Sequence, residues 1–185
     1  MVNAAPLFLD ELTGLHHRAY FLDRLSEAAE AAQTGQHALA LLLVDLDNLF
    51  LINMERGRQH GDRALVALAM TLQRSARPGD TVARLGGDQF VMLLPGTSLV
   101  TATQFACGIR SLVGRAHDVH LDLGTIDVCI GVAACPERAP WRAHELLSLA
   151  DLRLDSAKRS RHRPGCPQQV WAGPPELPDE ADGDG

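Results

Sequence analysis

Apolar and polar positions follow two different periods along the chain. Four segments place apolar residues three or four positions apart, which predicts amphipathic helices with one buried face. These segments are residues 18–32, 62–74, 98–114 and 144–159. Four further apolar runs have the length of strands, namely residues 38–44, 81–85, 89–94 and 126–134. The first and last of these runs are apolar almost throughout, which is typical of strands buried on both faces.

The order of these elements predicts an α/β fold with a single mixed central β-sheet flanked by helices. Gly86-Gly87-Asp88 separates two of the strands, which predicts a hairpin. At 185 residues the chain is long enough for one domain with a substantial core. We expect a lead over residues 1–9 and the domain over residues 10–163.

The end of the chain has a different composition. Residues 164–185 are rich in proline, glycine and acid, and they offer too little apolar surface to order themselves. We therefore expect this tail to be disordered. Trp171 lies inside it, and the sequence leaves open whether this side chain docks on the body, docks on a partner or is exposed by chance.

Composition and charge narrow the classes of partner. The chain is 46% hydrophobic and 22% charged with a net charge of −6, which argues against nucleic acid or an anionic membrane as a partner. No apolar run approaches the roughly 20 residues that span a bilayer, and no secretory leader is visible. A cytoplasmic location is expected. The cysteines, without a CxxC pair, are interpreted as structural thiols and not zinc ligands: Cys107, Cys129, Cys135 and Cys166.

Acidic residues mark the end of one predicted strand and the tip of the predicted hairpin. Asp45 and Asp47 follow the run 38–44, and Asp88 lies in the hairpin. Strand ends at the open edge of an α/β sheet are where such folds place their ligands. If the strands are neighbours, Asp45 and Asp88 converge on one Mg²⁺, which prefers hard oxygen ligands. Each feature taken alone is more often a plain solvated turn.

Five sequence blocks surround this constellation in a constant order. They are residues 10–18; Asp45 and Asp47 with Asn53, Gly57, Gly61 and Asp62; Arg77 and Asp80; Gly86-Gly87-Asp88-Gln89-Phe90; and a late block with Cys129 to Ala133, Ala150-Asp151 and Lys158. Arg77 to Asp80 precedes Gly86 by five residues. Together the blocks resemble the GGDEF family of diguanylate cyclases over about residues 10–163.

The resemblance implies a fold of the nucleotidyl-cyclase type and a reaction. Two GTP molecules, one on each domain of a head-to-head dimer, would condense to cyclic di-GMP with loss of pyrophosphate. Several roles follow for the substrate site, with Mg²⁺ or Mn²⁺ as cofactor. Asp45 and Asp88 would bind the metal, and Asp88 and position 89 would be the catalytic positions. Asn53 and Asp62 would bind the guanine edge of the substrate. Gly86 and Gly87 would also bind substrate, and Lys158 would bind its triphosphate.

Lys158 and the Arg77–Asp80 pair could each be functional residues or ordinary surface residues. Lys158 is the only lysine among 17 basic residues, so arginine would be expected at a merely solvated position, which favours retained phosphate binding. Arg77 and Asp80 match the family's inhibitory site for cyclic di-GMP, and an arginine fork suits guanine and phosphate. A surface ion pair in a turn explains the same two residues equally well.

Gln89 is the main departure from the family pattern, which has an acid at that position. Glutamine keeps the shape and an oxygen but lacks the charge and cannot act as a base, and losing a general base typically costs about 10²–10⁴ in rate. Other departures surround the site: Leu49-Phe50 stands for Phe-Lys, Met54 for an acid, Gly57-Arg58 for Gly-His and Asp155 for tyrosine.

Three hypotheses therefore remain. The leading one is a degenerate GGDEF domain of cyclic di-GMP signalling that binds GTP or cyclic di-GMP with weak or no cyclase activity. The second is an active diguanylate cyclase, and the third is a protein-interaction module that needs no nucleotide. Only nine residues precede Asp10, so we expect no dimerisation element there, and a second copy or another protein as partner.

Overall fold

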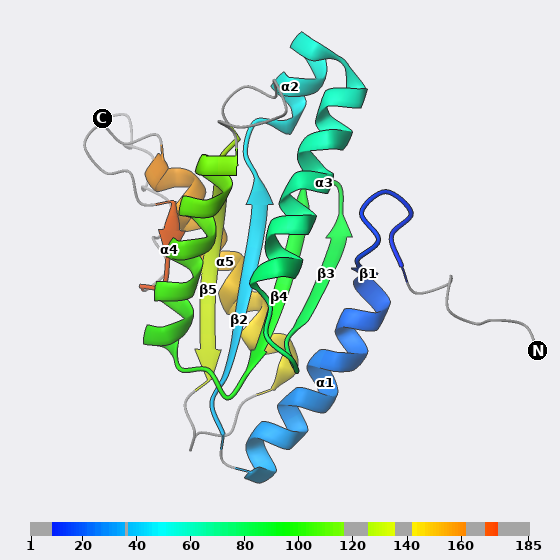
Figure 1. Cartoon of the computed structure of the whole chain (residues 1–185). Coiled ribbons are helices and arrows are strands. Elements are labelled where there is room, and N and C mark those ends of the chain that lie inside the picture. The colour runs from blue at the N-terminus through cyan, green and yellow to red at the C-terminus, as the bar shows by residue number, and fades with distance from the viewer. Residues whose placement is uncertain (1–8, 36, 117–125, 136–141, 162–168, 174–185) are drawn as a thin grey trace, which may run out of the picture.

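The fold is a six-stranded mixed sheet between two layers of helices (Figure 1). The computed structural model describes residues 9–35, 37–116, 126–135, 142–161 and 169–173. The strands lie in the order β1-β3-β4-β2-β5-β6 and comprise β1 (His16–His17), β2 (Leu39–Leu46), β3 (Thr81–Gly86), β4 (Gln89–Pro95), β5 (Val128–Cys135) and β6 (Val170–Trp171). The predicted α/β class with one mixed sheet is confirmed.

Five helices accompany the sheet in the described part of the chain: α1 (Arg18–Gly35), α2 (Leu49–Arg56), α3 (Arg58–Ser75), α4 (Leu99–Ala116) and α5 (Ala143–Arg161). Helices α3 and α4 pack on one face of the sheet, and α1 and α5 pack on the other. The four predicted helices exist, each one to four residues longer than predicted at one or both ends. Helix α2 was not predicted, because its eight residues are shorter than the window in which a helical period can be recognised.

Strand β2 is the centre of the sheet and all of its residues are buried. It runs antiparallel to both β4 and β5. Its alternate residues point to opposite faces, with Leu41 and Leu43 packed beside α1 and α5, and Leu42 and Val44 beside α3 and α4. A strand buried on both faces is apolar along most of its length, which explains the uninterrupted run that precedes Asp45.

Gly131 lets α5 lie directly against β5. A Cβ at this position would come within 2.9 Å of the Leu154 Cα atom and closer still to the backbone of Ala150. The helix therefore packs with its own backbone on the strand, and the small side chains of Ala150 and Ala157 are completely buried there. This close packing determines where the end of α5, including Lys158, lies over the sheet.

Strand β6 differs from the disorder predicted for residues 164–185. Val170 and Trp171 pair in parallel with Ile130 and Gly131 of β5, and Gln169 is buried. The prediction is therefore wrong for residues 169–173, because the exposed edge of β5 supplies backbone partners that composition does not reveal. Trp171 docks on the body beside α5. Residues 162–168 and 174–185 lie outside the described residues, and these ranges include the rest of the predicted tail.

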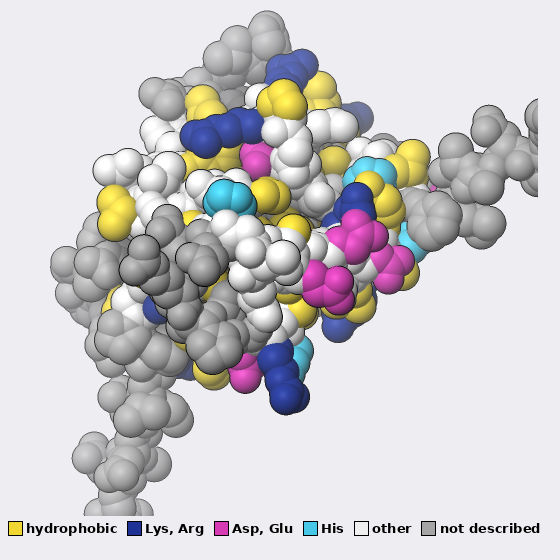
Figure 2. Space-filling view, turned by 90° about the horizontal axis from the view of Figure 1, so that it is seen from below, with side chains coloured by type: hydrophobic (Ala, Val, Ile, Leu, Met, Phe, Trp, Pro, Cys, Tyr) yellow, Lys and Arg dark blue, Asp and Glu magenta, His cyan; other side chains and the backbone are white. Residues whose placement is uncertain are grey.

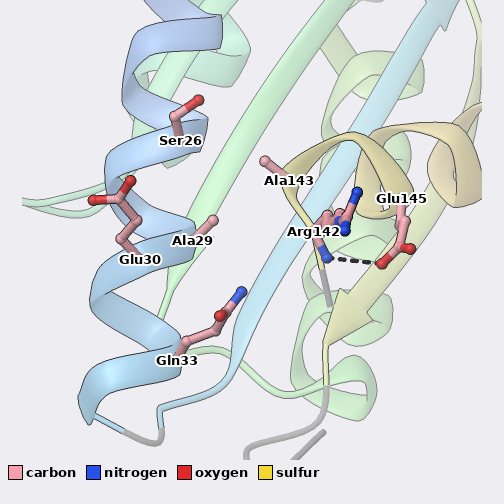
Figure 3. A pocket seen from close by; sticks show the side chains of 7 residues that line it. All are labelled: Ser26, Ala29, Glu30, Gln33, Arg142, Ala143 and Glu145. Carbon is pink, nitrogen blue, oxygen red and sulfur yellow. Dashed lines mark hydrogen bonds between the residues drawn. The ribbon is translucent and has the colours of Figure 1, made fainter. Parts of the chain in front are cut away.

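The two ends of the sheet differ in character. At the end where β2 starts, a cavity of about 450 Å³ lies between α1 and α5, lined among others by Ser26, Glu30, Gln33, Arg142 and Glu145 (Figure 3). Figure 2 views the molecule from this end, where acidic side chains gather on one side. The main polar contact within the cavity is local, since the Arg142 backbone N–H donates to Glu145 Oε2 at 2.7 Å. The predicted substrate-site residues lie at the other end. Arg77 and Asp80 directly precede β3, which runs parallel to β2, so these two residues lie at the end where β2 starts.

Candidate functional site

Asp45 lies at the centre of the candidate site, one residue before the end of β2. Its Cα atom pairs with those of Gln89 in β4 and Cys129 in β5. Only 5% of the residue is exposed. The Lys158 ammonium of α5 donates to Asp45 Oδ2 at 2.7 Å. Two residues that are 113 positions apart in the sequence therefore form one partly buried ion pair.

The surroundings of the Asp45–Lys158 ion pair contain more negative than positive charge. Burial raises the pKa of Asp45; the hydrogen bond and charge of Lys158 oppose this, and the carboxylates of Asp88 and Asp47 add to it. Burial would lower the pKa of Lys158, but the hydrogen bond and charge of Asp45, with the charge of Asp88, raise it overall. Asp45 is thus affected by two other carboxylates and by a single ammonium. A bound cation would relieve that imbalance.

The glycine hairpin lies directly beside the end of β2. The Leu46 backbone N–H donates to the Asp88 carbonyl oxygen at 3.0 Å, so Asp88 is held next to the residue that follows Asp45. Gly86 and Gly87 have φ angles of 136° and 56°. Residues with a side chain rarely adopt these values, which explains why both positions are glycine. The hairpin that carries Asp88 and the end of β2 that carries Asp45 therefore lie side by side.

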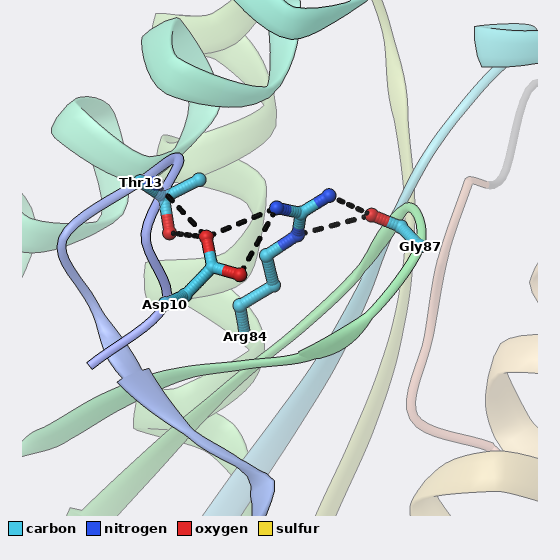
Figure 4. Close-up of polar contacts among 4 residues, drawn as sticks. All are labelled: Asp10, Thr13, Arg84 and Gly87. Atoms are coloured by element: carbon cyan, nitrogen blue, oxygen red, sulfur yellow. Dashed lines mark hydrogen bonds and ion pairs between the residues drawn. The ribbon is translucent and has the colours of Figure 1, made fainter. Parts of the chain in front are cut away.

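Arg84 ties the hairpin to the first sequence block (Figure 4). Its guanidinium donates to the Gly87 carbonyl at 2.6 and 3.1 Å and to the two oxygens of Asp10 at 3.0 and 3.2 Å. Asp10 also accepts hydrogen bonds from the backbone N–H and hydroxyl of Thr13. Partial burial opposes ionisation, but the bonds from Thr13 and Arg84 lower the pKa of Asp10 overall. The sequence analysis missed Arg84, whose only signal was its place two residues before the glycines.

We expect Arg84→Met to destabilise the fold by about 1–3 kcal/mol at neutral pH, since two acceptors lose a charged donor in a partly buried position. Because the pKa of Asp10 is lowered in the folded state, the stability from this carboxylate is present above its unfolded pKa and lost as the pH falls. Urea unfolding at pH 7 and pH 3 should show a difference between wild type and variant that shrinks at pH 3. An equal difference at both pH values would contradict the role of the ion pair, and Arg74→Met, on the exposed end of α3, is the control.

Asn53 lies on α2 and faces α3. Among the described residues, no donor reaches its buried side-chain oxygen. Gly61 of α3 makes this placement feasible, because a Cβ there would lie inside contact distance of the amide oxygen and 2.9 Å from the Asn53 Cγ atom. Asp62 follows on α3 and is half-buried. A buried acceptor without a donor is costly, and the close packing against Gly61 encloses this one.

Gly61→Ala is expected to destabilise the protein by about 1–3 kcal/mol, because the added methyl group must displace Asn53 and Leu49. The matched control is Gly108→Ala on α4, where the added Cβ meets nothing within 4 Å. That change should stabilise the protein by about 0.5–1 kcal/mol, as alanine does in a helix. Thermal unfolding of both variants checks the prediction. If Gly61→Ala leaves the stability unchanged, α2 moves away from α3 at little cost and the prediction is wrong.

Asp47 makes buried polar contacts of its own. Its Oδ2 accepts the Gln169 side-chain amide at 3.1 Å and the Cys129 thiol at 3.5 Å. Its backbone N–H donates to the Asp127 carbonyl at 2.9 Å. Asp47 therefore anchors β6 to the sheet. Sequence reasoning missed Gln169, which lies 122 positions away in a segment of apparently disordered composition.

Arg77 and Asp80 lie in the turn before β3. The Arg77 backbone N–H donates to Asp80 Oδ2 at 2.8 Å, and the Asp80 N–H donates to the Arg77 carbonyl at 3.0 Å. The Arg77 guanidinium lies over the Phe105 ring of α4 at 6.0 Å. The carboxylate thus closes the turn through the backbone and leaves the guanidinium exposed on the surface.

The carboxylates suit Mg²⁺ better than a metal that needs several protein ligands. Within the described ranges, no group of three or more His, Cys, Asp or Glu side chains is arranged to hold a metal ion. Mg²⁺ commonly takes only one or two carboxylates and completes its shell with substrate phosphates and water. Asp45 and Asp88 fit that donor set. Their mutual repulsion, which helps raise the pKa of Asp45, is the electrostatic mark of such a site.

The family of the chain follows from comparison with known proteins. A family model described as "Diguanylate cyclase, GGDEF domain" matches residues 7–164. This chain is a GGDEF domain. The sequence is 38% identical over 154 residues to the diguanylate cyclase TpbB of Pseudomonas aeruginosa, a match that covers 81% of this chain and 35% of TpbB. The chain thus spans about a third of the length of that relative.

Solved structures of GGDEF domains share the fold. The GGDEF domain of DgcB from Caulobacter crescentus, in complex with c-di-GMP, superposes with a TM-score of 0.80 at 30% identity, covering 92% of this chain and 95% of that one. The diguanylate cyclase SiaD of Pseudomonas aeruginosa, in complex with its activator SiaC, superposes with a TM-score of 0.75 at 30% identity, covering 83% and 58%. No helix in the described part of this GGDEF domain is long and apolar enough to cross a membrane.

The residues of the GGDEF signature lie partly in the hydrophobic core and partly at the candidate site. Phe90 is completely buried against α3 and α4. Gln89 alternates with it and pairs with Asp45, so its side chain stands on the Asp45 face of the sheet. The structure thus brings Asp45, Asp88 and Lys158 together with position 89. Asn53 and Asp62 lie on the adjoining helices, while Arg77 and Asp80 occupy a separate turn.

Proposed function

We propose that this GGDEF domain binds GTP with Mg²⁺ at the Asp45 site and cyclic di-GMP at the Arg77 turn, with weak or no cyclase activity. The observation that supports this most directly is the pairing of Asp45 with Gln89 in the sheet. The position that would supply a second carboxylate beside Asp45 supplies an amide. Nucleotide-binding groups are thus retained while a charge needed for the chemistry is lost.

The roles of the individual residues follow from their chemistry. Asp45 and Asp88 would hold Mg²⁺, which screens the triphosphate charge and positions it. Lys158 bonds to Asp45 in this structure, and its ammonium would also neutralise a phosphate oxygen. The Asn53 side-chain amide would bind the guanine edge, and the Asp62 carboxylate would accept a guanine N–H. The ion pair with Asp45 is a reason for lysine at position 158 that is independent of phosphate binding.

Two alternatives make different predictions. A genuine cyclase is favoured by the intact Asp45, Asp88 and Lys158 cluster, and it would convert GTP to cyclic di-GMP in the presence of Mg²⁺ or Mn²⁺. A nucleotide-independent interaction module would tolerate Asp45→Ala and Asn53→Ala without loss of its biological effect. Chromatography of the products after incubation with GTP separates the first alternative from the proposal.

Calorimetry with a non-hydrolysable GTP analogue and with cyclic di-GMP tests the proposal. We expect both to bind, with Asn53→Ala weakening the GTP analogue alone and Arg77→Ala weakening cyclic di-GMP alone. This crossed pattern separates the two sites within one protein. If neither nucleotide binds at high micromolar concentration, the proposal is wrong and the interaction module is favoured.

A further inference from the structure

A single turn joins the strand that carries Asp45 to the helix that carries Asn53. Only Asp47 and Asn48 lie between the end of β2 and the start of α2. Asn48 has a φ angle of 60°, and its side chain does not cap the helix. A residue with a side chain rarely adopts this left-handed conformation unless neighbouring contacts fix the backbone. The path of the chain from β2 into α2 therefore depends on contacts that the turn makes with the rest of the fold.

Asp47 supplies such contacts to three other residues. It is 4% exposed, and its backbone N–H donates to the Asp127 carbonyl oxygen at 2.9 Å. Its Oδ2 atom accepts hydrogen bonds from the Gln169 amide at 3.1 Å and from the Cys129 thiol at 3.5 Å. A thiol is a weak donor, so the amide is the stronger of these two side-chain partners. The carboxylate of the turn is thus held mainly by a residue of the segment that forms β6.

Gln169 is fixed in place by the edge of the sheet. Its carbonyl oxygen accepts the Ile130 N–H at 2.7 Å, and the next residue, Val170, pairs with Ile130 of β5. The side chain is buried, and among the described residues no donor reaches its Oε1 atom. A buried amide with an unpaired oxygen costs stability, which an apolar side chain would avoid. The bond to Asp47 is therefore the contact for which position 169 needs an amide.

We propose that Gln169 is a positioning residue for the nucleotide site and acts through Asp47 on the turn between β2 and α2. This turn sets the separation of Asp45 and Asn53. In the proposed function these two residues hold the metal-bound triphosphate and the guanine of one GTP molecule, so their separation must match the ligand. The effect on GTP rests on the proposed function, whereas the effect on the turn does not. Gln169 lies after residues 7–164, the range that the family model matches, so the family pattern does not include this contact.

Hydrogen exchange of the full chain without nucleotide tests the effect on the turn. The Asp47 N–H bonds to the Asp127 carbonyl and the Ile52 N–H bonds to the Asn48 carbonyl, so the two amides report on the turn and on the start of α2. Gln169→Leu should speed their exchange about tenfold to a hundredfold, the factor that a hydrogen bond to a charged group typically contributes. Unchanged exchange at both amides overturns the proposal.

Val170→Ala is the matched control. Val170 packs on the hydrophobic core from the next position of the chain, so its truncation weakens β6 while the Gln169 side chain stays in place. Thermal unfolding should show that the control is destabilised, and the exchange of the Asp47 and Ile52 amides should rise much less than in Gln169→Leu. An equal rise in both variants would show that the packing of β6, and not the amide, controls the turn, and would overturn the proposal.

A change of charge separates the hydrogen bond from the size of the side chain. Gln169→Glu should speed exchange at the turn at least as much as Gln169→Leu, because two carboxylates then face each other. Adding Asp47→Asn should recover most of the loss, since an amide again donates to a carboxylate with the roles exchanged. A double variant that exchanges as fast as Gln169→Glu alone contradicts the proposed hydrogen bond.

Calorimetry with Mg²⁺ and the non-hydrolysable GTP analogue tests the effect on the site. Gln169→Leu should weaken binding of the analogue about threefold to thirtyfold, the range for residues that act on a site through others. Binding of cyclic di-GMP at the Arg77 turn, at the opposite end of the sheet, should stay unchanged. Unchanged affinity for the analogue despite faster exchange overturns the positioning role. If wild type itself binds no analogue, the proposed function fails, while the exchange experiment still decides whether Gln169 holds the turn.

Discussion

Gln89→Glu is expected to raise the rate of cyclic di-GMP formation by about 10²–10⁴, the range that a positioned general base typically contributes. The position is well placed for this gain, because residue 89 pairs with Asp45 and shares its face of the sheet. Glutamate would restore a charge and a proton acceptor without a change of shape. The measurement is product formed from GTP with Mg²⁺ or Mn²⁺, separated by chromatography.

The control for this prediction is Gln73→Glu, the same chemical change on the exposed part of α3. It should leave the rate unchanged. If Gln89→Glu binds Mg²⁺–GTP like wild type and still forms no product, the departures at Phe50, Met54 and Asp155 become the better explanation. If wild type already turns over at the rate of the variant, the chain is an active cyclase and the ranking of hypotheses is wrong.

Gln89→Glu is also expected to lower the thermal stability of the metal-free protein. A glutamate at position 89 would stand directly across from Asp45, where like charges destabilise a strand pair by up to about 1 kcal/mol. Added Mg²⁺ should remove that penalty and stabilise the variant more than wild type. Such a crossover in thermal unfolding would report metal binding independently of activity.

Lys158→Met is expected to have the largest effect on stability, a loss of about 2–3 kcal/mol at neutral pH. Removing one partner of a buried ion pair leaves an uncompensated charge, at a typical cost of about 3–5 kcal/mol. The lower value applies because the Lys158 side chain is 37% exposed and solvent screens the pair. Urea unfolding measures the change.

The loss should depend on pH with a definite sign. Without Lys158, the folded-state pKa of Asp45 rises further above its unfolded value, so the folded protein prefers the protonated acid. The penalty is therefore absent at low pH and grows as the pH rises through and above the unfolded pKa. Lys158→Arg should retain most of the stability. Asp45→Asn combined with Lys158→Met should recover much of the loss, and a strictly additive double variant would contradict the ion pair.

The hydrophobic pattern alone predicted most of the fold. Strand β2 is buried on both faces, and only a continuous apolar run such as 38–44 satisfies both. Helices α1, α3, α4 and α5 each bury one face, and the three-to-four-residue spacing of their apolar residues predicts that face from the sequence. The short elements could not be predicted, because two-residue strands such as β1 and β6 have no period and depend on a neighbouring strand for their hydrogen bonds.

The sequence by itself determined the family, the likeness of the site to a diguanylate cyclase and the departure at Gln89, since these depend on residue identity and spacing. Only the tertiary structure decided which groups meet. It pairs Lys158 with Asp45, Arg84 with Asp10 and Gln169 with Asp47, across 113, 74 and 122 positions. Side chains so far apart in the chain are brought together by the packing of layers on the sheet, which no local pattern encodes.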